Sequence, residues 1–191
     1  LVSISFAPIL LSATPAPPFQ SAQPMTVREL FRASPLGSFG ALALGGIFSA
    51  MFGMSAVFGV ERGLTVAQIS VFITAIYVGG MALQYPIGWL SDRIDRRKLI
   101  VAAAAVGALV AAAGFAGLDG TVLIVAAVLI GGTANPLYSL TIAHINDFLP
   151  TEKMASAAAA AGMLAGLGAV AGPLAAGALM DALGADAYFL F

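Results

Sequence analysis

Five long runs of the chain contain no Asp, Glu, Lys or Arg, and each one is long enough to cross a lipid bilayer. A membrane-spanning helix needs about 20 apolar residues, at a rise of about 1.5 Å per residue. Only 9% of the residues are charged and 60% are hydrophobic, whereas a soluble domain has about a quarter charged residues. The sequence therefore predicts an all-α fold, a multi-pass bundle of transmembrane helices. The predicted spans are residues 36–60, 66–90, 99–118, 121–146 and 154–180.

The segments on either side of these spans differ from them in composition and length. Residues 1–11 are apolar but too short to cross a bilayer, so we expect them to be the end of a truncated transmembrane helix. Residues 12–35 begin with a proline-rich stretch, which is typical of an extended linker. Within this linker, Thr26 and Glu29 have the spacing of a capping box, which predicts a short helix lying on the membrane surface. A sixth apolar segment starts at residue 187.

The densest charge cluster lies between the second and third predicted spans, in residues 88–98. It holds four of the eight basic residues. When the chain is followed through alternating crossings, seven basic residues fall on the side of this loop and only Arg62 falls on the other. Lys and Arg are retained on the cytoplasmic side of a membrane. The loop is therefore predicted to be cytoplasmic, in an integral protein of the plasma membrane.

Charge and residue types exclude several classes of function. The net charge of −1 provides no electrostatic basis for binding nucleic acid. The absence of cysteine excludes disulfides, thiolate catalysis and Cys-ligated metals. We expect no cofactor and no metal site, since the single histidine, His144, has too few neighbouring ligands. No hydrolase or nucleotide-binding motif occurs, so the chain is predicted not to be an enzyme.

Two motifs resemble signatures of a known family. Residues Gly88, Asp92, Arg93, Arg96 and Arg97 match the pattern G-x-x-x-D-R-x-G-R-R/K, and Asp95 stands where the pattern usually has Gly. This pattern is similar to the loop between the second and third helices in each half of major facilitator superfamily transporters. The second motif, on the fifth span, resembles the G-x-x-x-G-P helix-packing pattern of the same family and comprises Gly168, Gly172 and Pro173.

The resemblance implies that the chain is most of one six-helix half of such a transporter. Five complete spans and truncated ends would place residues 36–191 in the C-terminal half, and residues 12–35 in the cytoplasmic linker between the halves. The chain looks similar to the bacterial YcaD-type branch, which implies the bacterial inner membrane. The implied partners are the missing N-terminal half, the lipid bilayer and a small-molecule substrate, with proton coupling left open.

The resemblance also implies a latch, a set of ion pairs that closes the cytoplasmic end of the transporter in its outward-open state. We expect Asp92 near residues 151–154, because a carboxylate is stabilised at a helix N-terminus. Arg93 and Arg97 are expected to pair with Asp147, with Glu152 as the rival acid. In the alternative interpretation, the loop only fixes the orientation of the helices. The predicted latch residues are Gly88, Asp92, Arg93, Arg96, Arg97 and Asp147.

Polar side chains within the spans are the candidates for a substrate cavity, because they are costly in lipid. They are Gln84, Asn135, Tyr138 and His144. The alternative is that they form hydrogen bonds between helices without touching substrate. His144, with Asp147 three residues later, fits either a proton relay or a helix-end cap.

The leading functional prediction is transport of a small solute by a secondary active transporter that works by alternating access. Three alternatives remain open at this point: a permease subunit of an ATP-driven transporter, a membrane scaffold that transports nothing, and an intramembrane enzyme.

Overall fold

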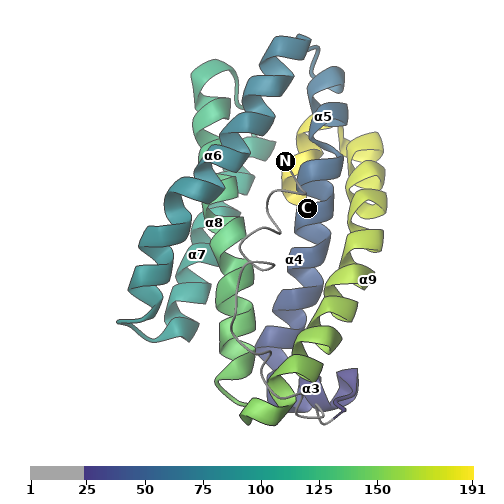
Figure 1. The fold of residues 1–191 in the computed structure, drawn as a ribbon. Coiled ribbons are helices and arrows are strands. Elements are labelled where there is room, and N and C mark those ends of the chain that lie inside the picture. Colours follow the sequence, from purple (N-terminus) through teal and green to yellow (C-terminus); the bar gives the residue numbers. More distant parts are fainter. Residues whose placement is uncertain (1–23) are drawn as a thin grey trace, which may run out of the picture.

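The computed structural model describes residues 24–191, which form a bundle of helices (Figure 1). The predicted end of a truncated helix at residues 1–11 lies outside the described residues. The elements are α3 (Val27–Ala33), α4 (Pro35–Gly53), α5 (Ser55–Glu61), α6 (Val66–Ser91), α7 (Arg96–Phe115), α8 (Gly120–Asn146), α9 (Thr151–Leu183) and the 3₁₀ helix η1 (Ala185–Leu190). Five of these helices, α4, α6, α7, α8 and α9, are long and apolar enough to cross a membrane. The predicted all-α bundle with membrane-length helices is confirmed.

Capping boxes begin two of the helices, and one of them is the box predicted at Thr26 and Glu29. At α3, the Glu29 N–H donates to the Thr26 hydroxyl (3.2 Å), and the Thr26 N–H donates to the Glu29 carboxylate (2.7 Å). This backbone hydrogen bond lowers the pKa of the Glu29 carboxyl, so the carboxylate half of the box is weakened only when the pH falls through that lowered value. Thr65 and Gln68 make the same pair of contacts at the start of α6.

The first predicted span, 36–60, is divided between two helices. The structure breaks it at Met54 into α4 and α5. Two hydroxyls compete with the backbone for the Met51 carbonyl: the Ser55 hydroxyl and the Tyr188 hydroxyl both donate to it. Side-chain donors of this kind offer a carbonyl an alternative to the helical ladder. One of these donors is local, and the other comes from near the far end of the chain.

Several other boundaries also differ from the predicted spans. Helix α7 begins at Arg96, so the basic residues form its first turn instead of a loop before it. Asp95 is its N-cap, with its carboxylate accepting from the Arg97 N–H (2.9 Å). Helix α9 extends past both predicted ends, to Thr151 and Leu183. The sixth apolar segment begins as a 3₁₀ helix at Ala185, with Tyr188 and Phe189 buried in the core.

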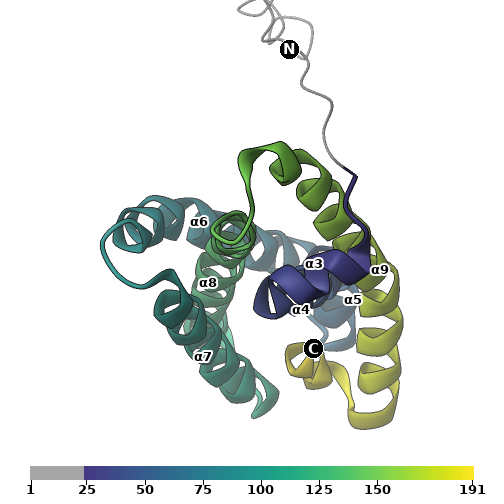
Figure 2. The same cartoon turned by 90° about the horizontal axis from the view of Figure 1, so that it is seen from below.

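Two closely packed helix pairs, α4 with α9 and α6 with α8, build the bundle (Figures 1 and 2). Glycines allow the backbones to approach. A Cβ on Gly79 of α6 would clash with the Val128 carbonyl of α8, and a Cβ on Gly45 of α4 would clash with the Ala165 carbonyl of α9. Small residues at helix crossings provide packing contacts in lipid, where no hydrophobic effect drives helices together. Helix α7 packs mainly against α8, at the outside of the bundle (Figure 2).

Candidate functional site

One ion pair joins three helices at the end of the bundle that carries α3. The Arg96 Nη1 atom lies 2.6 Å from both carboxylate oxygens of Asp147, and Arg96 Nε donates to the Ser91 hydroxyl (3.1 Å). Arg96 opens α7, Asp147 caps the end of α8 and Ser91 ends α6. The side chains are 23% and 49% exposed, respectively. We call Arg96 and Asp147 the latch pair.

In this structure Asp147 pairs with Arg96 and not with the predicted Arg93 or Arg97. Arg93, expected to pair with it, instead stacks on Trp89, with its Cζ atom 3.6 Å from the ring centroid, and donates to the Trp89 carbonyl (3.0 Å). Arg97 is exposed, whereas Arg96 is partly buried next to α8. Because α7 starts at Arg96, the helix itself determines which arginine faces Asp147.

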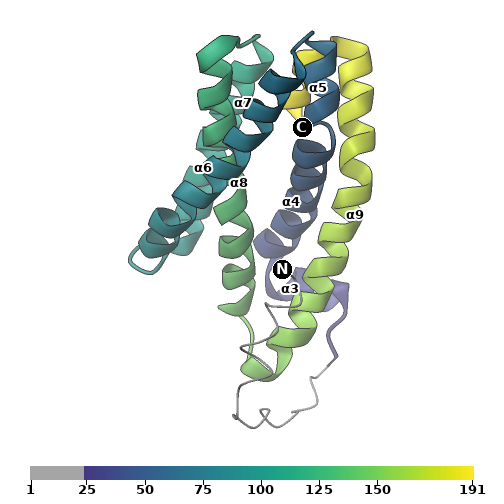
Figure 3. The ribbon, with the colours of Figure 1, turned by 45° about the horizontal axis from the view of Figure 1, so that its top comes forward.

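The expected contact between Asp92 and the start of α9 is also not found among residues 24–191. Asp92 is the C-cap of α6, and the loop between α6 and α7 lies apart from the beginning of α9 (Figures 1 and 3). Glu152, the rival acid, is exposed in the first turn of α9. Gly88 lies in open space, where a Cβ would meet nothing within 4 Å. Of the predicted latch residues, the structure brings together only Arg96 and Asp147.

Two of the four predicted cavity residues lie on an exposed face of the bundle. Gln84 Nε2 donates to the Ser139 hydroxyl (3.1 Å), which links α6 to α8. Tyr138, next to Ser139, is 36% exposed. Its ring centroid is 5.9 Å from that of Phe48 on α4.

Asn135 and His144, the other two predicted cavity residues, lie elsewhere in the bundle. Asn135 donates to the Gly131 carbonyl of its own helix (3.0 Å) and occupies the space beside Gly80, where a Cβ would lie 2.5 Å from its Nδ2 atom. It therefore packs α8 against α6. His144 is buried, with its ring edge-on to Phe148 at a centroid distance of 5.0 Å. It lies one turn before Asp147, close to the latch pair, and does not line either hollow described below.

Four aromatic rings from three helices form a row on the exposed face, and sequence reasoning missed three of them. Phe52 stacks on Tyr77 at a centroid distance of 4.8 Å, Phe48 lies 6.1 Å from Phe52, and Tyr138 ends the row. A hollow of about 760 Å³ lies against Phe48, Phe52 and Tyr138, with small residues of α9 on its other side. We call Phe48, Phe52, Tyr77 and Tyr138 the aromatic row.

Comparison with known proteins identifies the family to which this arrangement belongs. A sequence model described as Major Facilitator Superfamily matches residues 36–191, which is most of the chain. The chain belongs to the Major Facilitator Superfamily. It is also similar to a protein of Bacillus subtilis (strain 168) named "Uncharacterized MFS-type transporter YfkF", with 26% identity over 147 residues, or 75% of this chain. The chain covers 37% of the length of that relative. No solved structure matches.

Family membership makes this Major Facilitator Superfamily chain an integral membrane protein, in agreement with its five membrane-length helices. The YcaD-type branch remains a prediction. The glycines of the second motif lie where α9 meets α4. A Cβ on Gly168 would clash with the Leu42 carbonyl, and a Cβ on Gly172 would clash with the Gly46 carbonyl. Pro173 lies inside α9, one residue further on.

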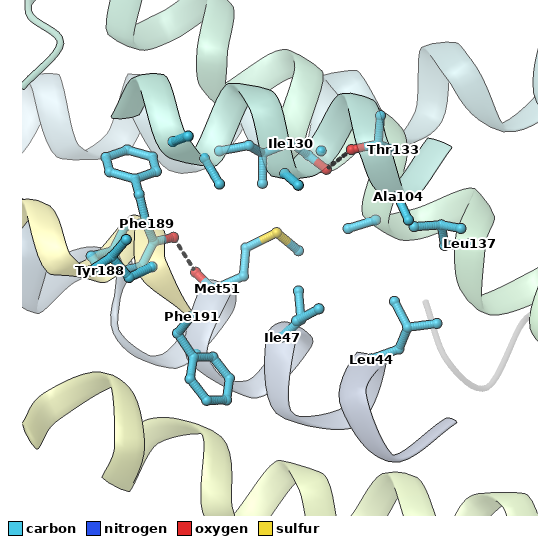
Figure 4. Close-up of a pocket in the computed structure, with 17 residues that line it drawn as sticks. Leu44, Ile47, Met51, Ala104, Ile130, Thr133, Leu137, Tyr188, Phe189 and Phe191 are labelled. Carbon is cyan, nitrogen blue, oxygen red and sulfur yellow. Dashed lines mark hydrogen bonds between the residues drawn. The ribbon is translucent and has the colours of Figure 1, made fainter. Parts of the chain in front are cut away.

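A second hollow in this superfamily chain, of about 400 Å³, lies between α4, α7, α8 and η1 (Figure 4). Its lining is almost entirely aliphatic and aromatic. The hydroxyls that border it already donate to carbonyls: Thr133 to Ile130 (3.1 Å) and Tyr188 to Met51 (3.1 Å). Both hydroxyl hydrogens are therefore already used within the protein, and the hollow offers a ligand a mostly apolar lining.

Proposed function

We propose that this chain forms one half of a secondary transporter that moves a small solute across the bacterial inner membrane by alternating access. The single observation that carries this proposal is the latch pair, a two-oxygen ion pair that joins the α6–α7 connection to the end of α8. The missing N-terminal half would be its partner across the cavity.

The distribution of basic residues supports an orientation in which the end of the bundle with the latch pair faces the cytoplasm. Seven basic residues lie at the end of the bundle with the latch pair, and Arg62 lies at the other. Because Lys and Arg are retained in the cytoplasm, the latch pair would lie at the cytoplasmic mouth. There it would favour the state that is closed on that side.

The latch pair is partly exposed, so its effect is a bias between two states. An exposed ion pair contributes about 1 kcal/mol or less, and a difference of 1 kcal/mol changes an equilibrium about fivefold. Since a transporter must visit both states, a weak pair is suitable: a much stronger one would trap the closed state.

We expect Arg96→Ala to increase access to the cavity from the cytoplasm by about fivefold. The reporter is a single cysteine at Gly166, where a Cβ meets nothing within 4 Å and which borders the hollow on α9. The described chain has no cysteine of its own, and any cysteine outside it would be replaced by serine. The measurement is the rate at which a membrane-impermeant thiol reagent labels this cysteine in inside-out vesicles.

Asp147→Ala should have the same effect, and the exchanged pair Arg96→Asp with Asp147→Arg should bring labelling back toward the original rate. Lys98→Ala is the matched control, because Lys98 is exposed in the same turn of α7. Equal labelling rates in all these variants would refute the latch.

A further inference from the structure

The aromatic row lies on a face that does not suit contact with lipid. Gln84 and Ser139 are exposed on this face, and their side chains are joined by a hydrogen bond. Tyr77 lies seven residues before Gln84 and is therefore on the same face of α6. Polar side chains within a membrane face a bundle interior or a water-filled cavity, because lipid leaves their remaining hydrogen-bonding groups unsatisfied. This face is therefore a site for a partner with both apolar and polar parts.

The row offers ring surfaces to such a partner. Tyr77 is 53% exposed and Tyr138 is 36% exposed, while Phe48 and Phe52 connect them in the middle. Aromatic rings attract other rings in stacked or edge-on arrangements, beyond the gain from burying apolar area. The adjoining hollow of about 760 Å³ is within the range of about 300–1,000 Å³ found for small-molecule sites.

Charge is absent from the surroundings of the row. The runs 36–60, 66–90 and 121–146, which supply the row, contain no Asp, Glu, Lys or Arg. The polar side chains on this face and in the adjoining hollow are neutral: the hydroxyls of Ser49, Tyr77, Tyr138 and Ser139 and the Gln84 amide. A charged ligand would lose its hydration here without gaining an ion pair from these helices.

We propose that the aromatic row is the substrate subsite for an uncharged aromatic compound, which packs against the exposed rings of the row from the adjoining hollow. The Gln84–Ser139 pair lies on the same face and would bind a polar substituent of that compound. This inference rests on the proposed transport function, because it names the substrate class for the cavity of that transporter.

The test is equilibrium binding to the purified natural protein that contains these residues, reconstituted in nanodiscs. The probes are naphthol as the neutral aromatic, ethidium as the aromatic cation, naphthalenesulfonate as the aromatic anion and methyl glucoside as the neutral non-aromatic. We expect naphthol to bind most tightly. Phe52→Leu and Tyr77→Leu, which keep apolar bulk but remove the ring, should each weaken naphthol binding about fivefold.

Tyr85→Leu is the matched control, because Tyr85 is also exposed on α6 but makes none of the ring contacts of the row. It should leave naphthol binding within about twofold, since a substitution away from the site has a small effect. Tighter binding of ethidium, of the sulfonate or of the glucoside would overturn the proposal. Equal weakening by all three leucine variants, or by none, would also overturn it.

The outcome is independent of the latch experiment. Binding in nanodiscs requires no transport cycle, so a ring-dependent naphthol signal with unchanged cysteine labelling would refute only the alternating-access latch. Faster cysteine labelling in the latch variants, together with naphthol binding that does not depend on the rings, would refute only the aromatic subsite.

Discussion

Replacing Gly168 by leucine should strongly destabilise this chain. A Cβ at this position would clash with the Leu42 carbonyl and lie 2.8 Å from the Gly46 nitrogen. Both obstacles are backbone atoms of α4, so no side chain can rotate away to make room. Overpacking usually costs about 1–3 kcal/mol, and we expect about 3 kcal/mol here, because two helices must separate along their contact.

The measurement is the thermal unfolding midpoint of the protein in detergent. For a chain of this size, about 3 kcal/mol corresponds to a fall of about 10 °C. Gly166→Leu is the matched control, two residues earlier on α9, where a Cβ would meet nothing within 4 Å. It should shift the midpoint by about 2 °C or less. Similar midpoints for the two variants would contradict the close α4–α9 packing.

Much of the fold follows from one property of the sequence, the placement of charge. Helices of membrane length begin and end near the charged residues that bound the uncharged runs, which is why α6 and α8 match their predicted spans within one residue. The break at Met54 could not be predicted in this way. One of the two hydroxyls at the break is that of Tyr188, which reaches Met51 from 137 positions away in the chain.

The candidate site was less predictable than the fold for a similar reason. Sequence identified the charged loop, but the pairing depends on which side of α7 each arginine occupies, and therefore on a helix start that lies three residues before the predicted one. Polar residues within spans were easy to recognise, and Gln84 and Tyr138 do lie on the exposed face. Phe48, Phe52 and Tyr77 were missed because apolar rings in a membrane helix carry no local signal; only the packing of α4 against α6 and α8 brings them into one row.

Arg62, the single basic residue at the end opposite the latch pair, should be among the most sensitive positions to substitution. Its Nη1 atom donates to both oxygens of Asp186 (2.8 and 2.6 Å), and its Nη2 atom donates to the Leu118 carbonyl (3.1 Å) and to Asp119. One guanidinium therefore joins the turn after α5, the turn before α8 and the start of η1. We expect Arg62→Ala to cost about 2 kcal/mol, since hydrogen bonds to charged groups contribute about 1.5–3 kcal/mol each but part of this cluster is exposed.

Substituting Asp186 and Asp119 one at a time separates their contributions to the stability that Arg62 provides. The Asp186 side chain is 26% exposed and that of Asp119 is 84% exposed, so Asp186→Ala should lower the thermal unfolding midpoint by about 6 °C and Asp119→Ala by about 2 °C or less. Arg62→Lys should fall between Arg62→Ala and the unchanged protein, because an ammonium cannot reproduce the forked contacts of a guanidinium. If Arg62→Ala and Asp186→Ala unfolded at the original temperature, the three turns would have to be held by apolar packing alone. In that case two buried rings of η1 would be the groups that fix this end of the bundle: Tyr188, which stacks on Phe58 at a centroid distance of 4.8 Å, and Phe189, which meets Phe58 edge-on at 5.2 Å.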